Sequence, residues 1–125
     1  MANLPQTVSE AWDKHTGPIV FGTVDTQGTP NLIYMTCVKK VAEDQIILVD
    51  NFFNKTRANI AAGSKGALVF ITEEGKSYQI KGTLEYQPAG PVYDDMKCWN
   101  SDKLPGVAAV VLHIEQVFSG ATKLA

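Results

Sequence analysis

The chain has 125 residues, enough for one domain and too few for two of ordinary size. Hydrophobic residues make up 45% and charged residues 19%, a globular composition that excludes a disordered chain. The 11 basic and 13 acidic residues give a formal charge of -2, and no basic run could neutralise successive phosphates along a duplex. We therefore expect a single domain over residues 1–125 and no nucleic-acid partner.

The start of the chain carries neither the basic nor the apolar region of a secretory signal. The longest apolar run, 107–112, is far shorter than the roughly 20 residues that span a bilayer. Cys37 and Cys98 form no CxxC pair, and the two histidines give no zinc spacing. These features predict a cytoplasmic protein with two buried free thiols and no membrane contact.

The first predicted element is a helix. Thr7 and Glu10 have the spacing of a capping box, and Gly17 followed by Pro18 ends the element. One apolar face is expected to consist of Leu4, Val8, Ala11 and Trp12.

From residue 19 onward, β-branched and aromatic runs alternate with short turns. We expect strands at 19–25, 32–40, 45–49, 67–72, 77–86 and 107–118, and further short helices at 54–62 and 91–100. Closely spaced strands with few helices favour an antiparallel barrel. Runs such as ALVFI and VAAVVL are nearly continuous in apolar character, which predicts strands covered on both faces.

Residues 49–59, VDNFFNKTRAN, run from the end of a predicted strand into a predicted helix. Asn54 is a favourable N-cap, so Lys55, Thr56 and Arg57 fall in the first turn. Two cations there oppose the positive end of the helix dipole, at about 0.3–1 kcal/mol each, and a bound anion would remove the conflict. The segment indicates either a phosphate site or a solvated helix end that binds nothing.

Several motifs together resemble those of a known family. GTP at 28–30 precedes the second strand, NKTRAN occupies 54–59, and a Lys-Gly pair at 81–82 lies in the fifth strand. With the leading helix and the long last strand, they resemble the FMN-binding split barrel, the pyridoxamine 5′-phosphate oxidase-like superfamily, and most closely its small FMN-binding proteins. The resemblance implies a mainly β fold, a six-stranded antiparallel split β-barrel with a few short flanking helices, and flavin mononucleotide (FMN) as cofactor.

The resemblance also implies roles for individual residues. In this family a Lys-Thr pair holds the FMN phosphate, which corresponds to Lys55 and Thr56, and Asn54 and Arg57 lie beside them. Residues of the second strand and of the end of the third line the isoalloxazine ring; the matching positions are Tyr34, Met35, Thr36, Val49, Asp50 and Asn51. Taken alone, Met35 and Val49 are also typical core residues.

A homodimer is expected on two grounds. One small barrel covers its apolar strands poorly, and in this family the partner subunit closes the pocket, often with an aromatic residue before the last strand. Trp99 matches that aromatic, although it is equally typical of an interface or core tryptophan. Gln79 is a further candidate, because the oxidases place a flavin-contacting glutamine on this strand, at a different spacing from Gly82.

No catalytic triad or metal-binding spacing is recognisable, and a second basic cluster for a phosphorylated substrate is missing. We therefore expect a redox protein whose chemistry belongs to FMN, either a flavin reductase-like enzyme or an electron carrier. Its partners would be NAD(P)H or a redox protein. The alternatives are a non-catalytic module that stores or senses FMN, and a pocket that binds heme or a deazaflavin.

Overall fold

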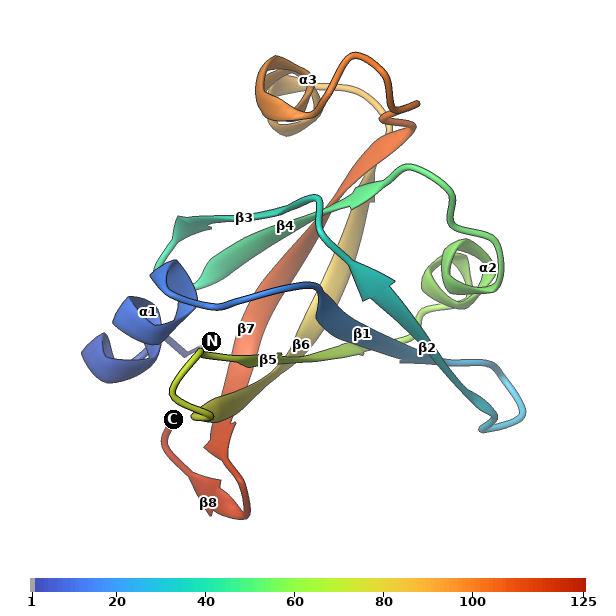
Figure 1. Ribbon diagram of the computed structural model, residues 1–125. Helices are drawn as coiled ribbons and strands as arrows, with labels where there is room; N and C mark the ends of the chain where they lie inside the picture. Colours follow the sequence, from blue (N-terminus) through green and yellow to red (C-terminus); the bar gives the residue numbers. More distant parts are fainter. Residues whose placement is uncertain (1) are drawn as a thin grey trace.

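The computed structural model describes residues 2–125, which form three short helices packed around a strongly curved sheet (Figure 1). The helices are α1 (Gln6–Asp13), α2 (Lys55–Ala61) and α3 (Pro91–Trp99). The strands are β1 (Ile19–Val24), β2 (Pro30–Met35), β3 (Val38–Ala42), β4 (Gln45–Asp50), β5 (Gly66–Ile71), β6 (Ser77–Gln87), β7 (Ala108–Ser119) and β8 (Thr122–Lys123). The order is β2-β1-β5-β6-β7-β4-β3, with β8 beside β7, and the named pairs are antiparallel. The expected mainly β, antiparallel split barrel is confirmed, with eight strands in place of six.

The split in the barrel follows from the link between β2 and β3. These strands lie at opposite ends of the strand order, yet only Thr36 and Cys37 separate them in the chain. The sheet must therefore curl until its two ends approach each other (Figure 1). The expectation of one strand over 32–40 is wrong, because the Val38 N–H donates to the Thr36 carbonyl at 3.1 Å and this tight turn redirects the chain.

Strand β7 is covered on both faces, as the sequence predicts, and so is β4; for the ALVFI run of β5 the expectation is wrong within one chain, because its outer face leaves Val69 and Ile71 exposed. The barrel interior holds alternate residues of β4 and β7, including Ile46, Leu48, Val110 and Leu112. The residues between them face outward, where Met96 of α3 packs on Ile47, Val49, Ala109 and Val111. A strand buried on both faces needs no polar alternation, which explains the continuous run in β7.

Helix α1 buries the apolar face that the sequence predicts, with Val8 and Trp12 at its centre. The capping box is wrong: the helix begins at Gln6 with Pro5 at its N-cap, and no side chain caps it. The fixed φ of Pro5, here -55°, suits the start of a helix two residues earlier than the Thr7 spacing indicates.

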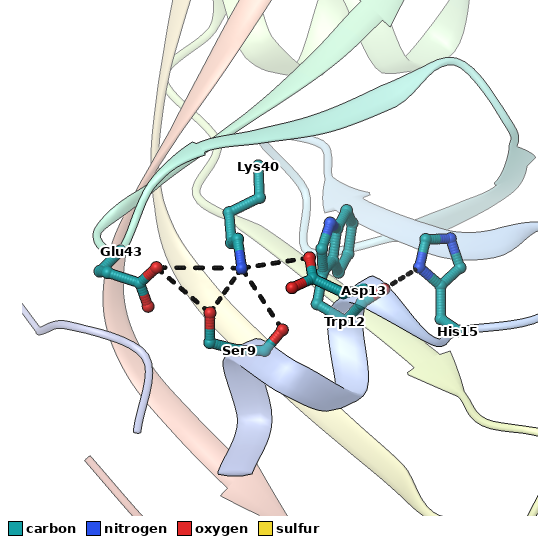
Figure 2. A network of polar contacts seen from close by, with 6 residues as sticks. All are labelled: Ser9, Trp12, Asp13, His15, Lys40 and Glu43. Atoms are coloured by element: carbon teal, nitrogen blue, oxygen red, sulfur yellow. Dashed lines mark hydrogen bonds and ion pairs between the residues drawn. The ribbon is translucent and has the colours of Figure 1, made fainter. Parts of the chain in front are cut away.

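A polar network fastens α1 to the β3–β4 hairpin (Figure 2). The Lys40 Nζ donates to the backbone carbonyl of Ser9 at 3.3 Å and pairs with Asp13 at 3.2 Å. The Ser9 hydroxyl also donates to Glu43 at 3.2 Å. Because the Lys40 ammonium lies near the carboxylates of both Asp13 and Glu43, its charge is balanced. The network therefore holds α1 against the hairpin.

Gly82 marks the irregularity where β6 and β7 shift register. A Cβ atom at this position would lie 1.9 Å from the His113 carbonyl oxygen, far inside contact distance. The close approach of the two backbones therefore requires glycine in the Lys-Gly pair.

Candidate functional site

A cavity of about 290 Å³ lies at the split, between β2 and the end of β4. Its walls come from five consecutive residues of β2 and the β2–β3 link, four residues around the start of the β4–α2 link, and one loop residue before β7. These are Ile33, Tyr34, Met35, Thr36, Cys37, Val49, Asn51, Phe52, Phe53 and Leu104. Five of the residues predicted to line a flavin ring thus share one cavity: Tyr34, Met35, Thr36, Val49 and Asn51. Their contact with a ligand stays a prediction.

The cavity has an apolar floor and an aromatic rim. Met35, Val49 and Phe53 are buried, whereas Tyr34 is 79% exposed and Phe52 is 76% exposed. Two large aromatic side chains left in solvent beside one cavity form a surface that a flat apolar group or a partner subunit would cover.

One polar side chain of the cavity wall is the carboxamide of Asn51. Its Oδ1 accepts the Gly106 backbone N–H at 2.9 Å and the Asn100 Nδ2 at 3.1 Å. The carbonyl of the carboxamide is therefore directed at the loop before β7.

Asp50 lies beside these residues in the chain but does not line the cavity. Its side chain is fully buried and accepts hydrogen bonds from Arg57 Nε at 2.7 Å, a terminal Arg57 nitrogen at 2.9 Å and the Tyr86 hydroxyl at 2.5 Å. The Phe53 N–H adds a fourth bond at 3.0 Å. The arrangement braces the turn between β4 and α2 and holds Arg57 at that turn.

These contacts shift the protonation equilibria of the group. Burial of the Asp50 carboxyl favours its neutral form, but hydrogen bonds from Arg57, Tyr86 and a backbone N–H outweigh it and hold its pKa below the usual value. Burial, followed by the hydrogen bond to Asp50, raises the pKa of Tyr86. Asp50 and Arg57 are thus both charged at neutral pH.

The start of α2 presents Lys55 to a second cavity of about 290 Å³, formed with the β1–β2 turn. Asp25 and Asn31 line the same space. Asn54 occupies the N-cap as predicted, although its side chain makes no capping hydrogen bond. Thr56 is buried, and its hydroxyl accepts the Asn31 side-chain amide at 3.1 Å. Within residues 2–125, Lys55 makes no salt bridge.

Gln79 and Trp99 lie apart from both cavities. Gln79 lines a larger hollow of about 650 Å³ on the outer face of β1, β5 and β6, together with Lys65 and Lys81. Trp99 packs against the cluster that Met96 of α3 forms with the outer side chains of β4 and β7. The Lys39 Nζ lies 5.6 Å from the centre of its ring. Neither residue joins the others within one chain.

Sequence reasoning missed several wall residues. Ile33 and Phe53 could have been predicted, since they lie on the same two chain segments as the residues predicted to line the ring. Leu104 could not be predicted, because its position depends on how the loop before β7 folds back onto β4. The two thiols also differ from expectation: Cys37 is half-buried at the cavity wall and Cys98 is exposed.

The residues present fit a flat ring that carries a phosphate. The cavity at the split offers an apolar floor, aromatic edges and a side-chain amide, which suit a planar heteroaromatic ring. Lys55 supplies a positive charge at the neighbouring helix start, and two such groups, a ring and an anion, occur together in FMN.

Comparison with known proteins agrees with this geometry. Residues 6–119 match the family model of pyridoxamine 5′-phosphate oxidase, and the chain belongs to that family. An uncharacterized protein of Methanocaldococcus jannaschii, MJ0282, is 35% identical over 107 residues, which cover 81% of this chain and 72% of that protein.

Solved structures share the fold. HupZ of Group A Streptococcus superposes with a TM-score of 0.80 at 25% identity, over 97% of this chain and 94% of HupZ. An FMN-binding protein of Syntrophomonas wolfei gives a TM-score of 0.74 at 18% identity, over 93% of this chain and 82% of that one. At such identities the second likeness concerns the fold alone.

None of the three helices in residues 2–125 combines the length and apolar character needed to cross a bilayer.

Proposed function

We propose that this chain is a flavoprotein that binds FMN at the split of the barrel. The observation that carries the proposal is the convergence of Tyr34, Met35, Thr36, Val49 and Asn51 on one cavity, next to the helix that begins with Lys55. Two chain segments that are separated by the whole β3 strand form this cavity together, as the family resemblance requires.

The phosphate is assigned to Lys55 in preference to Arg57. Arg57 already has a buried carboxylate partner in Asp50, whereas Lys55 has none among the described residues. A phosphate carries roughly -1.5 to -2 charges near neutral pH, by analogy with phosphorylated side chains, so an unpaired lysine is a suitable ligand. Thr56 would have to turn its hydroxyl from Asn31 toward the same group.

When bound, FMN supplies the capacity to accept and donate electrons. The chain's own residues bind and orient the cofactor. The buried floor would shield the cofactor from water, the Asn51 NH₂ would donate a hydrogen bond to it, and Asp50 with Arg57 keeps the β4–α2 turn in place. We propose a redox role, as a flavin reductase-like enzyme or an electron carrier.

A homodimer is part of the proposal. The outer face of β2, β1 and β5 exposes a row of apolar side chains: Val24, Leu32, Tyr34, Val69 and Ile71. Leu32 is 69% exposed. Tyr34 of β2 pairs with Val20 of β1, and Val20 pairs with Val69 of β5, so these side chains lie on the same face of the sheet. Since Tyr34 also borders the cavity, a second copy on this face would close the ligand site.

The absorption spectrum of the purified protein, before and after incubation with FMN and dialysis, tests cofactor identity. Retained flavin bands in the near-ultraviolet and blue support the proposal. A colourless protein contradicts it, and a heme or deazaflavin spectrum would assign another cofactor to the cavity. Steady-state NAD(P)H oxidation then separates a reductase from a storage or sensing module, which should react no faster than free FMN.

A further inference from the structure

The orientation of the Asn51 carboxamide is fixed by a group that can only donate. The Gly106 backbone N–H lies 2.9 Å from the atom assigned as Asn51 Oδ1, and a backbone N–H requires an acceptor there. The usual ambiguity between the oxygen and nitrogen of a side-chain amide is therefore removed. The NH₂ group is the other end of the carboxamide, on a residue that lines the cavity.

The same reasoning orients Asn100. Its side chain faces Asn51 Oδ1 at 3.1 Å and must present its NH₂ group there, since two oxygens would repel. Asn100 is 8% exposed, and its own Oδ1 receives no hydrogen bond from the described protein groups. A buried acceptor without a donor is unfavourable, so the residue stabilises the fold less than its burial suggests.

The network also holds a wall of the cavity. Asn100 and Gly106 flank the loop that carries Leu104, and Leu104 lines the cavity. Lys97 also holds this loop, since its Nζ donates to the Pro105 carbonyl at 3.1 Å. Asn51 thus joins the end of β4 to this loop.

We propose that Asn100 is a positioning residue for the ligand site: with the Gly106 N–H, it locks Asn51 so that its NH₂ group donates into the cavity. The group selected by this donor is a hydrogen-bond acceptor on the edge of a planar ring, such as a carbonyl oxygen or an imine nitrogen. This inference rests on the proposed function, because it concerns the ring end of the proposed FMN site.

Asn51→Asp separates a ligand role from a structural one. Aspartate keeps an acceptor for both Gly106 and Asn100, so the melting temperature should be unchanged or slightly higher. The cavity, however, loses its donor and gains an acceptor that faces an acceptor of the ligand. FMN and riboflavin binding should weaken together, by about 10- to 100-fold in fluorescence titrations.

Asn100→Asp tests the lock itself. The carboxylate repels the Asn51 Oδ1 that the Gly106 N–H still holds, so the carboxamide should leave its locked orientation and its NH₂ group should no longer donate into the cavity. Both flavins should again bind about 10-fold more weakly, although residue 100 does not touch the cavity. Asn3→Asp, the same change at an exposed position near α1, should leave both affinities unchanged.

Side-chain amide NMR signals give a second measurement. In ¹⁵N-labelled wild type, the Asn51 NH₂ protons should shift on addition of FMN and equally with riboflavin; in Asn100→Asp this response should be lost. If wild type binds both flavins but Asn51→Asp binds them equally well, the inference is overturned and the proposed function stands. If wild type binds neither flavin, the proposed function itself fails.

Discussion

The Arg57 guanidinium donates to both carboxylate oxygens of Asp50, at 2.7 and 2.9 Å, across the turn that joins β4 to α2. The Asp50 side chain is fully buried, whereas 43% of the Arg57 side chain is exposed. Two cations at the start of α2 oppose the positive end of the helix dipole. The Asp50 carboxylate neutralises one of them, Arg57, and leaves Lys55 without a partner among the described residues. The pair therefore gives Arg57 a structural role at the turn, whereas Lys55 stays available for an anion.

Replacing Asp50 by asparagine should destabilise the fold. The uncharged amide cannot accept from Arg57, Tyr86 and Phe53 N–H as the carboxylate does, and the free energy of unfolding should fall by about 1–3 kcal/mol, a range that allows for the solvent around Arg57. Urea unfolding followed by circular dichroism measures the change. Asp95→Asn, an exposed site on α3, should change stability by no more than about 0.5 kcal/mol. Equal effects of the two variants would remove Asp50 from its proposed bracing role.

The lowered pKa of the Asp50 carboxyl predicts that the free energy of unfolding decreases at acid pH. Because its pKa in the folded state is lowered, Asp50 contributes stability that is complete above the unfolded-state pKa of about 3.9 and is lost as the pH falls through the folded-state value. The difference in unfolding free energy between wild type and Asp50→Asn should be constant above about pH 5 and shrink below about pH 4. A difference independent of pH down to acid unfolding would contradict this assignment.

Much of the fold is local in origin and so could be predicted. The apolar runs of β5 and β7 identify strands, and the NKTRAN segment identifies the start of α2. The break at Thr36–Cys37 could not be predicted, since neither residue is a turn former and the bend depends on pairing of the flanking segments with different strands. The two-residue β8 is too short to leave a sequence signal.

The candidate site divides in the same way. Tyr34, Met35 and Thr36 are adjacent in sequence, so predicting that their segment borders the ligand is enough to place all three at the cavity. The Asp50 carboxylate was expected at the ligand but is occupied by Arg57 and by Tyr86, a partner 36 residues away. Such long-range contacts require knowledge of the strand order, which composition and periodicity do not supply.

The exposed apolar face predicts a dimer that can be broken by one charge. Leu32→Glu places a carboxylate at the centre of the outer face of β2 and β1, where a partner would have to desolvate it. Light scattering should change from twice the chain mass of 13.6 kDa to the monomer value, and FMN binding should weaken because the cavity loses its cover.

Val41→Glu is the matched control, since Val41 is an exposed apolar residue on β3, the other end of the strand order. It should stay dimeric and bind FMN as wild type does. Wild type that is monomeric at micromolar concentration with FMN present would rule out the dimer.

Asp25 offers a charge test of the second cavity. It shares the cavity with Lys55, while its Oδ1 accepts the Gln27 and Thr29 N–H groups. Asp25→Asn keeps this acceptor and removes the negative charge. A phosphate in this cavity should then be held more tightly, so FMN affinity should rise by about 2- to 5-fold while riboflavin affinity stays constant. Unchanged FMN affinity would place the phosphate elsewhere.

The most direct test of the proposed FMN site is a fluorescence titration of wild type and Lys55→Ala with both FMN and riboflavin. A charge-assisted contact to phosphate contributes about 1.5–3 kcal/mol, so Lys55→Ala should weaken FMN binding by about 10- to 100-fold. Riboflavin, which has no phosphate, should bind both proteins almost equally, and the stability of the ligand-free protein should not fall. The proposed FMN site is contradicted if wild type binds neither flavin, or if Lys55→Ala weakens riboflavin binding as much as FMN binding.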